Sequence, residues 1–174
     1  MWGKSSRIQR VGIKLTIDMR HRSIFGLSNV LILCVIIFAF SGYFTFHFEY
    51  IGFVLVGLSV VCLLSLIPFK IPIQSVQPDV IFGIIDNGIL ALFAVIGAEV
   101  AGVAGAIVGG VAGNAITDGV AGLFEGYSAE RLRKKNIDER RTVLGSAVGK
   151  MSGSLLGAGV VLILDVFLKT LFFS

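Results

Sequence analysis

Five apolar blocks occupy most of the 174 residues and constrain the fold more than any other feature of the chain. The blocks lie at about 25–46, 51–68, 80–100, 103–126 and 144–168, with short polar segments between them. Each comes close to the ~20 residues that a helix needs to cross the hydrocarbon core of a bilayer. With 55% hydrophobic residues and a mean hydropathy of +0.91, the chain also lies outside the range of soluble globular domains. The sequence predicts an all-α polytopic membrane protein with about five transmembrane helices.

Basic residues gather in two clusters, and these clusters predict the orientation of the chain. Together they hold 12 of the 15 Lys and Arg residues: Lys4, Arg7, Arg10, Lys14, Arg20 and Arg22, and Arg131, Arg133, Lys134, Lys135, Arg140 and Arg141. Short basic segments stay on the cytoplasmic side, so we expect the N-terminus and the 128–143 loop there. In a chain of five spans, four of them lie between the N-terminus and the 128–143 loop, which puts both segments on the same side. Span count and charge therefore agree. Beside apolar spans the clusters favour anionic lipids over nucleic acid as partners, and the short loops suggest a prokaryotic cytoplasmic membrane.

Composition divides the chain into six segments. They are a basic cytoplasmic or interfacial segment (1–23), a two-span apolar hairpin (24–68), a proline-containing cytoplasmic connector (69–78), a glycine-rich helical hairpin with intramembrane carboxylates (79–127), a basic cytoplasmic loop (128–143) and a final transmembrane helix (144–174). The first segment alternates apolar and polar residues as a strand does, but its basic residues suit a helix on the membrane surface, which we favour. Around the connector, Pro68, Pro72 and Pro78 are unsuited to a helix interior.

Glycines recur every four residues in the last three spans. The two rows are Gly105, Gly109 and Gly113, and Gly149, Gly153 and Gly157. This spacing places small residues on one helix face and lets the backbones of membrane helices approach closely. We therefore expect the last three spans to form a tight bundle with the first two spans packed outside it. A tight turn is expected in the glycine-rich stretch near residue 101.

Polar side chains interrupt the glycine-rich hairpin where a membrane helix normally has none. Asn114, Asp118 and Glu125 are spaced i, i+4 and i+11, which puts them on one helix face. Asp86 and Asp118 share a depth of about 10 to 14 Å from the membrane edge, at 1.5 Å per residue. A charge at such depth costs about 2.5–3.5 kcal/mol, so it marks an ion or proton path or has a partner. We predict that Asp86, Asn114, Asp118 and Glu125 bind an ion or a proton.

Two residues of the last span bear on these carboxylates. Lys150 lies at a comparable depth and is a candidate counter-ion, so purely structural ion pairing is the alternative. One lysine cannot neutralise three carboxylates, and protons or a divalent cation would supply the balance. Met151 could lend a soft sulfur ligand to a transition metal, although a lone methionine also suits core packing. The predicted metal ligands are Asp86, Glu125 and Met151.

The sequence carries no pattern typical of an enzyme. We find no nucleophile with a paired base, no phosphate-binding loop and no histidine spacing for a metal site. Cys34 and Cys62 lie inside apolar blocks, where a free cysteine behaves as a small hydrophobic residue. We expect no enzymatic activity and no tightly bound cofactor.

Three phrases within residues 79–141 occur in an order that resembles a known family. They are "VIFGIIDNG", "AGVAGA" and "EGYSAERLRKK". The stretch is similar to the first two spans of the vacuolar iron transporter family. Members of that family open with a phrase close to "IVFGANDGL", continue with "AGVAGA", and end the second span in a Gly-Glu-Tyr phrase before a charged cytoplasmic helix. In this chain two apolar blocks precede the stretch and one follows it.

The resemblance implies export of a divalent ion, Fe2+ or Mn2+, from the cytoplasm in exchange for protons. It also implies a dimer with the ion path at the dimer interface. Asp86 would match the first-span aspartate on that path, and Glu125 the second-span glutamate. The residues leave one other interpretation open, a non-catalytic accessory or scaffold subunit of a larger membrane complex, whose glycine faces dock partner helices.

Overall fold

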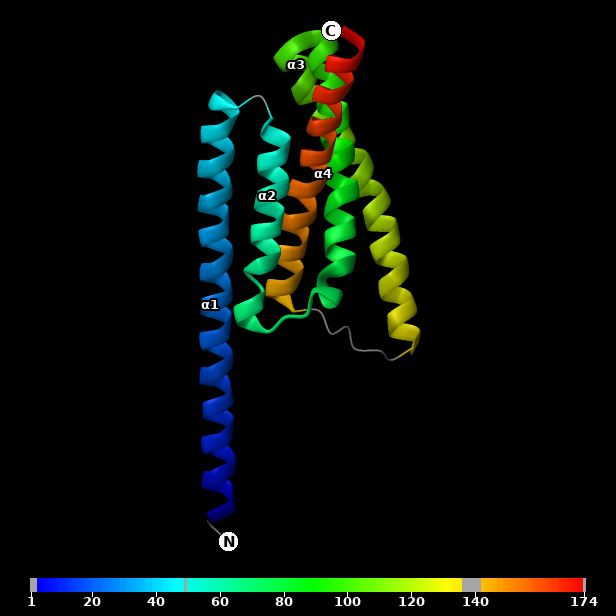
Figure 1. Ribbon diagram of the computed structural model, residues 1–174. Helices are drawn as coiled ribbons and strands as arrows, with labels where there is room; N and C mark the ends of the chain where they lie inside the picture. The colour runs from blue at the N-terminus through cyan, green and yellow to red at the C-terminus, as the bar shows by residue number, and fades with distance from the viewer. Residues whose placement is uncertain (1–2, 49, 136–141, 174) are drawn as a thin grey trace.

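Within the residues that it describes, the computed structural model is helical and has no strand (Figure 1). It describes residues 3–48, 50–135 and 142–173, and places the side chains of residues 24–48, 50–121, 123 and 142–172. The helices are α1 (Gly3–His47), α2 (Ile51–Leu64), a short 3-10 helix η1 (Ile67–Phe69), α3 (Ile73–Lys135) and α4 (Val143–Phe173). Their apolar stretches long enough to cross a membrane are Ile24–His47, Ile51–Phe69, Ile73–Ala121 and Val143–Phe172. The prediction of an all-α polytopic membrane protein is confirmed.

α3 is a helical hairpin rather than a single rod. Its apolar stretch of 49 residues would be about 73 Å long if straight, more than twice the ~30 Å hydrocarbon core. The helical backbone breaks at Ala101 (φ −140°, ψ 25°) and at Gly102, whose φ of +57° is a conformation that favours glycine. We call residues 73–100 the first arm and residues 103–135 the second arm. The described residues thus form five long helical segments, and the predicted turn near residue 101 is confirmed.

Glycines allow the two arms to lie backbone to backbone. A Cβ on Gly105 would overlap the carbonyl oxygen of Gly97, and one on Gly109 would overlap that of Phe93. Farther from the turn, a Cβ on Gly113 would lie 3.1 Å from the Cα of Leu90. Positions in the two arms therefore pair in antiparallel register, and the predicted glycine row forms the contact between them.

The second glycine row, on α4, packs on the other side of the first arm. A Cβ on Gly153 would overlap the carbonyl oxygen of Val80, and one on Gly83 would lie 2.6 Å from that of Lys150. Gly157 meets the backbone of Ile84 in the same way. In these contacts the residue numbers rise together in the two helices. α4 and the first arm therefore run parallel and stay in close contact over several turns.

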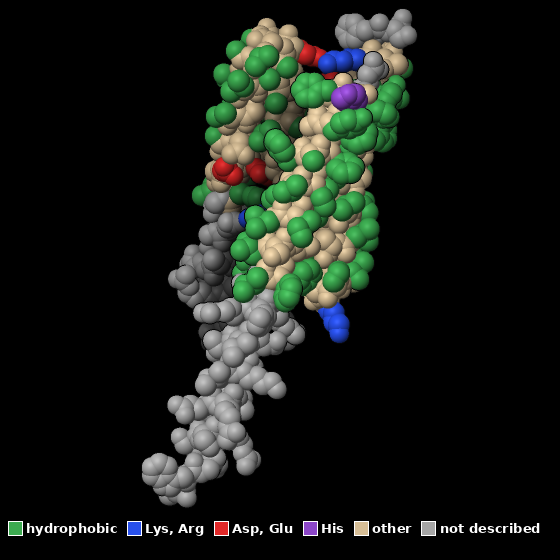
Figure 2. Space-filling view, turned by 90° about the vertical axis from the view of Figure 1, so that its left-hand side faces the viewer, with side chains coloured by type: hydrophobic (Ala, Val, Ile, Leu, Met, Phe, Trp, Pro, Cys, Tyr) green, Lys and Arg blue, Asp and Glu red, His purple; other side chains and the backbone are tan. Residues whose placement is uncertain are grey.

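Close packing extends beyond the last three spans to α2, which the sequence had placed outside the bundle. A Cβ on Gly52 of α2 would lie 2.7 Å from the carbonyl oxygen of Gly159, and the buried hydroxyls of Ser59 and Ser152 are hydrogen-bonded at 2.9 Å. α1 is peripheral and contributes Leu33 to the buried core beside Cys62. Figure 2 shows hydrophobic side chains spread over the coloured part of the surface, with few charged side chains among them. The order across the molecule is second arm, first arm, α4, α2, with α1 beside α2 and α4.

Three expected boundaries differ in the structure. α3 begins at Ile73 rather than at residue 79, so Pro78 lies inside a helix. It is tolerated because it removes a single backbone bond, to the carbonyl of Gln74, an exposed residue in the first turn. Residues 128–135, expected to be loop, continue the second arm to Lys135, while residues 136–141 lie outside the described residues. Residues 3–23 are helical and continuous with the first span, so no strand forms there.

The ends of the helices sort into two groups. One end of the molecule carries the α1–α2 turn, the turn of α3 and the C-terminus (Figure 1). The other end carries the connector between α2 and α3, the end of the second arm and the beginning of α4. N-terminal residues of α1 project beyond this second end, so the described parts of the two basic segments, residues 3–22 and 131–135, lie at the same end of the bundle.

Candidate intramembrane cation site

Asp86 lies between the two arms of α3, half-buried. The antiparallel register of the arms brings Thr117 opposite to it, and the Thr117 hydroxyl donates a hydrogen bond to Asp86 Oδ1. The second carboxylate oxygen, Oδ2, accepts from the side-chain amide of the adjacent Asn87 at 3.3 Å. Both oxygens of this carboxylate thus accept hydrogen bonds from neutral donors of the hairpin.

Asn87 connects the carboxylate to α4. Its amide nitrogen also donates to Ser154 Oγ at 2.7 Å. An amide has two N–H donors, so it can serve Asp86 and Ser154 together. The resulting polar cluster, which we call the Asp86 cluster, consists of Asp86, Asn87, Thr117 and Ser154 and joins three helical segments inside the apolar part of the molecule.

The Thr117 hydroxyl has more acceptors than protons. Besides Asp86 it lies 3.2 Å from the carbonyl oxygen of Gly113 and 3.0 Å from that of Asn114, and Thr117 itself is only 6% exposed. One hydroxyl proton can serve one of these acceptors at a time. Thr117 can therefore donate either across the hairpin or within its own arm.

Asp118 lies at the level of Asp86, as predicted, but belongs to a different surface. Its Oδ2 accepts a hydrogen bond of 2.8 Å from the side-chain amide of Asn114 one turn away, which agrees with the predicted shared face. Asp118 is exposed on the outside of the second arm, whereas its neighbour Thr117 points into the hairpin. The structure therefore brings Asp86 to Thr117 and leaves the Asn114–Asp118 pair beside this contact.

Glu125 and Lys150 complete the predicted set, and their roles stay predictions. The backbone of Glu125 continues the second arm, but its side chain lies outside the described residues. Lys150 projects from α4 toward the first arm, and its ammonium group lies 4.8 Å from the centroid of the Phe82 ring. This is the distance of a cation–π contact.

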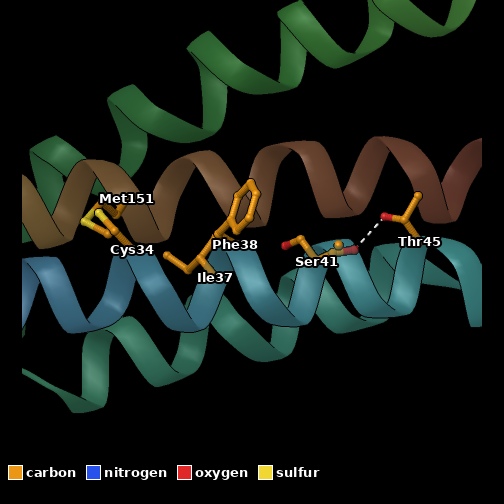
Figure 3. Close-up of a pocket in the computed structure, with 7 residues that line it drawn as sticks. Cys34, Ile37, Phe38, Ser41, Thr45 and Met151 are labelled. Carbon is orange, nitrogen blue, oxygen red and sulfur yellow. Dashed lines mark hydrogen bonds between the residues drawn. The ribbon is translucent and has the colours of Figure 1, made fainter.

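Met151 is not brought to the Asp86 cluster. It lines a groove of about 500 Å³ between α1 and α4, together with Cys34, Ile37 and Phe38 (Figure 3). At 100° per residue, Met151 points about 200° away from Gly153, the α4 residue that contacts the first arm. The soft ligand predicted for a metal and the intramembrane Asp86 therefore lie on different sides of α4.

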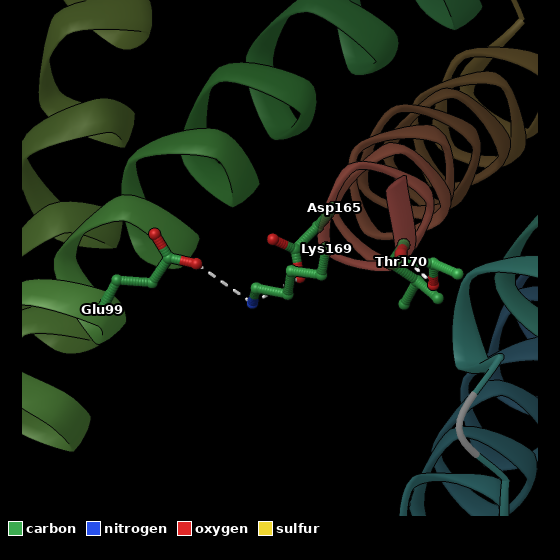
Figure 4. Close-up of polar contacts among 5 residues, drawn as sticks. Glu99, Asp165, Lys169 and Thr170 are labelled. Atoms are coloured by element: carbon green, nitrogen blue, oxygen red, sulfur yellow. Dashed lines mark hydrogen bonds and ion pairs between the residues drawn. The ribbon is translucent and has the colours of Figure 1, made fainter. Parts of the chain in front are cut away.

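Charges at the end that carries the α3 turn form a separate group. Lys169 Nζ lies 3.1 Å from Glu99 Oε1 and 2.9 Å from Asp165 Oδ2, and so links the first arm to α4 (Figure 4). Lys169 and Glu99 are about half exposed, at 51% and 56%. Both ends of this ion pair are therefore within reach of water.

Sequence reasoning missed the neutral members of the Asp86 cluster. Thr117 continues the row of Gly105, Gly109 and Gly113 by one more step of four, so the glycine spacing alone would have placed it in the hairpin. Asn87 stands four residues after Gly83 and shares its face. Asp79, another four residues before Gly83, is 2% exposed and accepts a 2.8 Å hydrogen bond from Ser146 of α4. A polar residue that continues a glycine row at the same spacing of four is the sequence signal that would have identified these residues.

In the described parts of the chain, no three His, Cys, Asp or Glu side chains gather closely enough to hold a metal ion. Comparisons with protein-family models, with characterised proteins and with solved structures give no match for this chain.

Proposed function

We propose that this chain is a small integral-membrane cation transporter in which Asp86 binds the transported or the coupling ion. The observation that carries the proposal is a carboxylate inside an apolar helical hairpin, both of whose oxygens accept hydrogen bonds from neutral groups. A charge at membrane depth is expensive and by default marks an ion or proton path. Neutral hydroxyl and amide partners leave its negative charge available to a cation.

The resemblance of residues 79–141 to the vacuolar iron transporter family supports the direction and the coupling in this proposal. It suggests proton-coupled export of a divalent cation such as Fe2+ or Mn2+ and assigns Asp86 to the ion path. In this scheme the basic N-terminus and the 128–143 segment face the cytoplasm. The Asp86 cluster then lies nearer the cytoplasmic end, seven residues beyond Asp79, and a prokaryotic cytoplasmic membrane is the proposed location.

The alternative is a scaffold subunit, and one observation favours it. The second arm exposes Asp118, which is bonded to the half-buried Asn114, together with large apolar side chains such as Ile107 and Val111. A partner helix, from a second copy of the chain or from another subunit, could cover such a surface. In this interpretation the Asp86 cluster only fastens the hairpin to α4.

Flux measurements in proteoliposomes test the proposal. Purified protein is reconstituted with an internal pH dye and an indicator for divalent ions, and wild type is compared with Asp86→Asn, which keeps the shape but removes the charge. We expect flux to fall at least tenfold in the variant. The matched control is Asp165→Asn, which removes a carboxylate from the far end of α4 and should retain flux. Equal flux in wild type and Asp86→Asn would overturn the proposal, and an inert wild type that co-purifies with other membrane subunits would establish the scaffold.

A further inference from the structure

The sulfur atoms of the described side chains gather at one junction of helices. They belong to Cys34 of α1, Cys62 of α2 and Met151 of α4, which stand far apart in the sequence. Cys34 and Met151 both line the groove between α1 and α4, and Figure 3 shows their sulfur atoms at the same end of it. Cys62 is completely buried and belongs to the core cluster against which Met151 packs.

The pairing of α1 with α2 brings the two cysteines toward each other. Asn29 of α1 donates a 3.1 Å hydrogen bond to Ser65 of α2, and one turn farther along α1, Leu33 shares the buried core with Cys62. Cys34 is the next residue of α1, close enough to Cys62 for the charge of one thiol group to act on the other. Each of the three sulfur-bearing side chains is therefore a neighbour of the other two.

The chemistry of these three groups selects a soft ion of low charge. Thiolate and thioether sulfurs favour soft metals such as Cu+, and no carboxylate or imidazole is among the described residues that line the groove. Two thiolates buried together in an apolar surrounding would be costly, so one thiolate, one thiol and the thioether form the favoured set. A single positive charge neutralises this set, whereas Zn2+ would leave a surplus charge and favours four ligands.

The groove also provides a route to the sulfurs. It follows α1 from Cys34 to Thr45, about 16 Å at 1.5 Å per residue, toward the end that carries the α1–α2 turn. Ser41 and Thr45 are its hydroxyl-bearing residues, and Thr45 donates to the Ser41 carbonyl oxygen at 2.6 Å. The buried Ser41 hydroxyl oxygen has no hydrogen-bond partner among the described residues. An ion that enters from this end would meet an available hydroxyl before it reaches the sulfurs.

We propose that Cys34, Cys62 and Met151 form a binding site for a soft monovalent metal ion, Cu+ or Ag+. Cys34, which lines the groove, supplies the thiolate, and its proton passes to water as the ion binds. The Met151 thioether and the Cys62 sulfur complete a shell of three sulfurs. The site lies on a different side of α4 from the Asp86 cluster, and it does not depend on the proposed transport function.

Competition for Cu+ tests this proposal on the purified chain. The protein is kept reduced and free of oxygen, and it is titrated with Cu+ in the presence of a coloured chelator that competes for the ion. We expect about one Cu+ per chain, and X-ray absorption of the loaded protein should show a first coordination shell of sulfur alone. A shell of nitrogen or oxygen, or the absence of stoichiometric binding, would overturn the proposal.

Substitutions of the groove sulfurs separate metal binding from packing. Cys34→Ser replaces the sulfur of an exposed residue with oxygen and should abolish binding. Met151→Leu nearly conserves volume, which cores tolerate, and should weaken Cu+ binding at least about tenfold through loss of the thioether. The matched control is Met19→Leu, which removes a thioether elsewhere in α1 and should bind as wild type does. If Cys34→Ser or Met151→Leu binds Cu+ as tightly as wild type, these sulfurs only pack and the proposal fails.

Two further measurements define the third ligand and the class of ion. Cys62→Ala should reduce the shell seen by X-ray absorption from three sulfurs to two, and an unchanged shell would rule out Cys62 as a ligand and with it the proposed site. Added Ag+ should displace bound Cu+, whereas an excess of Zn2+ should not. Displacement by Zn2+ would overturn the assignment to a soft monovalent ion. Gel filtration shows which variants are folded, and Asp86→Asn should bind Cu+ as wild type does.

Discussion

The first arm packs against α4 on one side and against the second arm on the other. Both contacts are made through small residues, but they differ in how closely the backbones approach. Toward α4, added Cβ atoms at Gly83, Gly153 and Gly157 would all collide with backbone. Toward the second arm the contact loosens with distance from the turn. A Cβ would overlap backbone at Gly105 and Gly109, and would lie 3.1 Å from its nearest neighbour at Gly113.

This difference bears on the ion site proposed at Asp86. On the closed side, Asp79 and Asn87 meet serines of α4 within a contact that has no spare room. On the other side, Asp86 and Thr117 meet where the glycine contact has begun to open. An ion-binding carboxylate needs space for its ligand and a route to it, so the opening side is the one suited to binding.

The largest effect is expected on the closed side. Gly153→Ala places a methyl group onto the Val80 carbonyl, and overpacking of this kind typically costs about 1–3 kcal/mol of unfolding free energy. The matched control is Gly57→Ala in α2, where a Cβ meets nothing within 4 Å and alanine is the better helix former. Unfolding by SDS titration in mixed micelles measures both. Equal stability of the two variants would mean that the α4 contact is not closed.

A graded effect is expected along the hairpin. Gly105→Ala should destabilise strongly, Gly113→Ala weakly, and Gly119→Ala should leave stability unchanged or raise it by up to about 1 kcal/mol through helix propensity. The same titration ranks the three proteins. A reversed order of stability, or equal stability of all three variants, would mean that the two arms are not packed more closely near the turn than near Asp86.

Removing the hydrogen bond between Asn87 and α4 should have a smaller effect. Ser154→Ala deletes the 2.7 Å acceptor of the Asn87 amide, and hydrogen bonds between membrane helices contribute about 0.6 kcal/mol on average and up to ~1.7. We expect a loss of stability in that range with ion binding at Asp86 retained. A loss of binding equal to that of Asp86→Asn would show that the two sides of the first arm do not act separately.

The smallest effect is expected at the end that carries the α3 turn. Lys169→Ala removes the contacts with Glu99 and Asp165, but exposed ion pairs contribute about 0–1 kcal/mol. Raising the salt concentration should reduce even this difference between variant and wild type. A loss of several kcal/mol would indicate that these charges hold α4 against the first arm as firmly as the glycines do.

The sequence predicted the parts of this fold that depend on local pattern. The lengths of the apolar blocks predicted five helical segments, and the glycine-rich stretch near residue 101 predicted the turn. Each of these features depends on a single stretch of the sequence. Pro78 was wrongly excluded from α3, since whether a helix tolerates proline depends on how many backbone bonds its position removes. Thr117 was missed because it reaches Asp86 only through the register of the hairpin, and the link from Asn87 to Ser154 was missed because it depends on the packing of α4.

Spin-label distances would test most directly whether the second arm is held firmly at its turn and loosely at the level of Asp86. The labels replace exposed residues in a background in which Cys34 and Cys62 are changed to alanine. Three pairs are compared by pulsed electron paramagnetic resonance: Ile85 with Val160, Ile96 with Ile107, and Ile81 with Val120.

The first pair reports the α4 contact, the second the hairpin near its turn, and the third the hairpin near Asp86. We predict narrow distance distributions for the first two pairs, and a broader one for Ile81 with Val120. Equally narrow distributions for all three pairs would contradict the account.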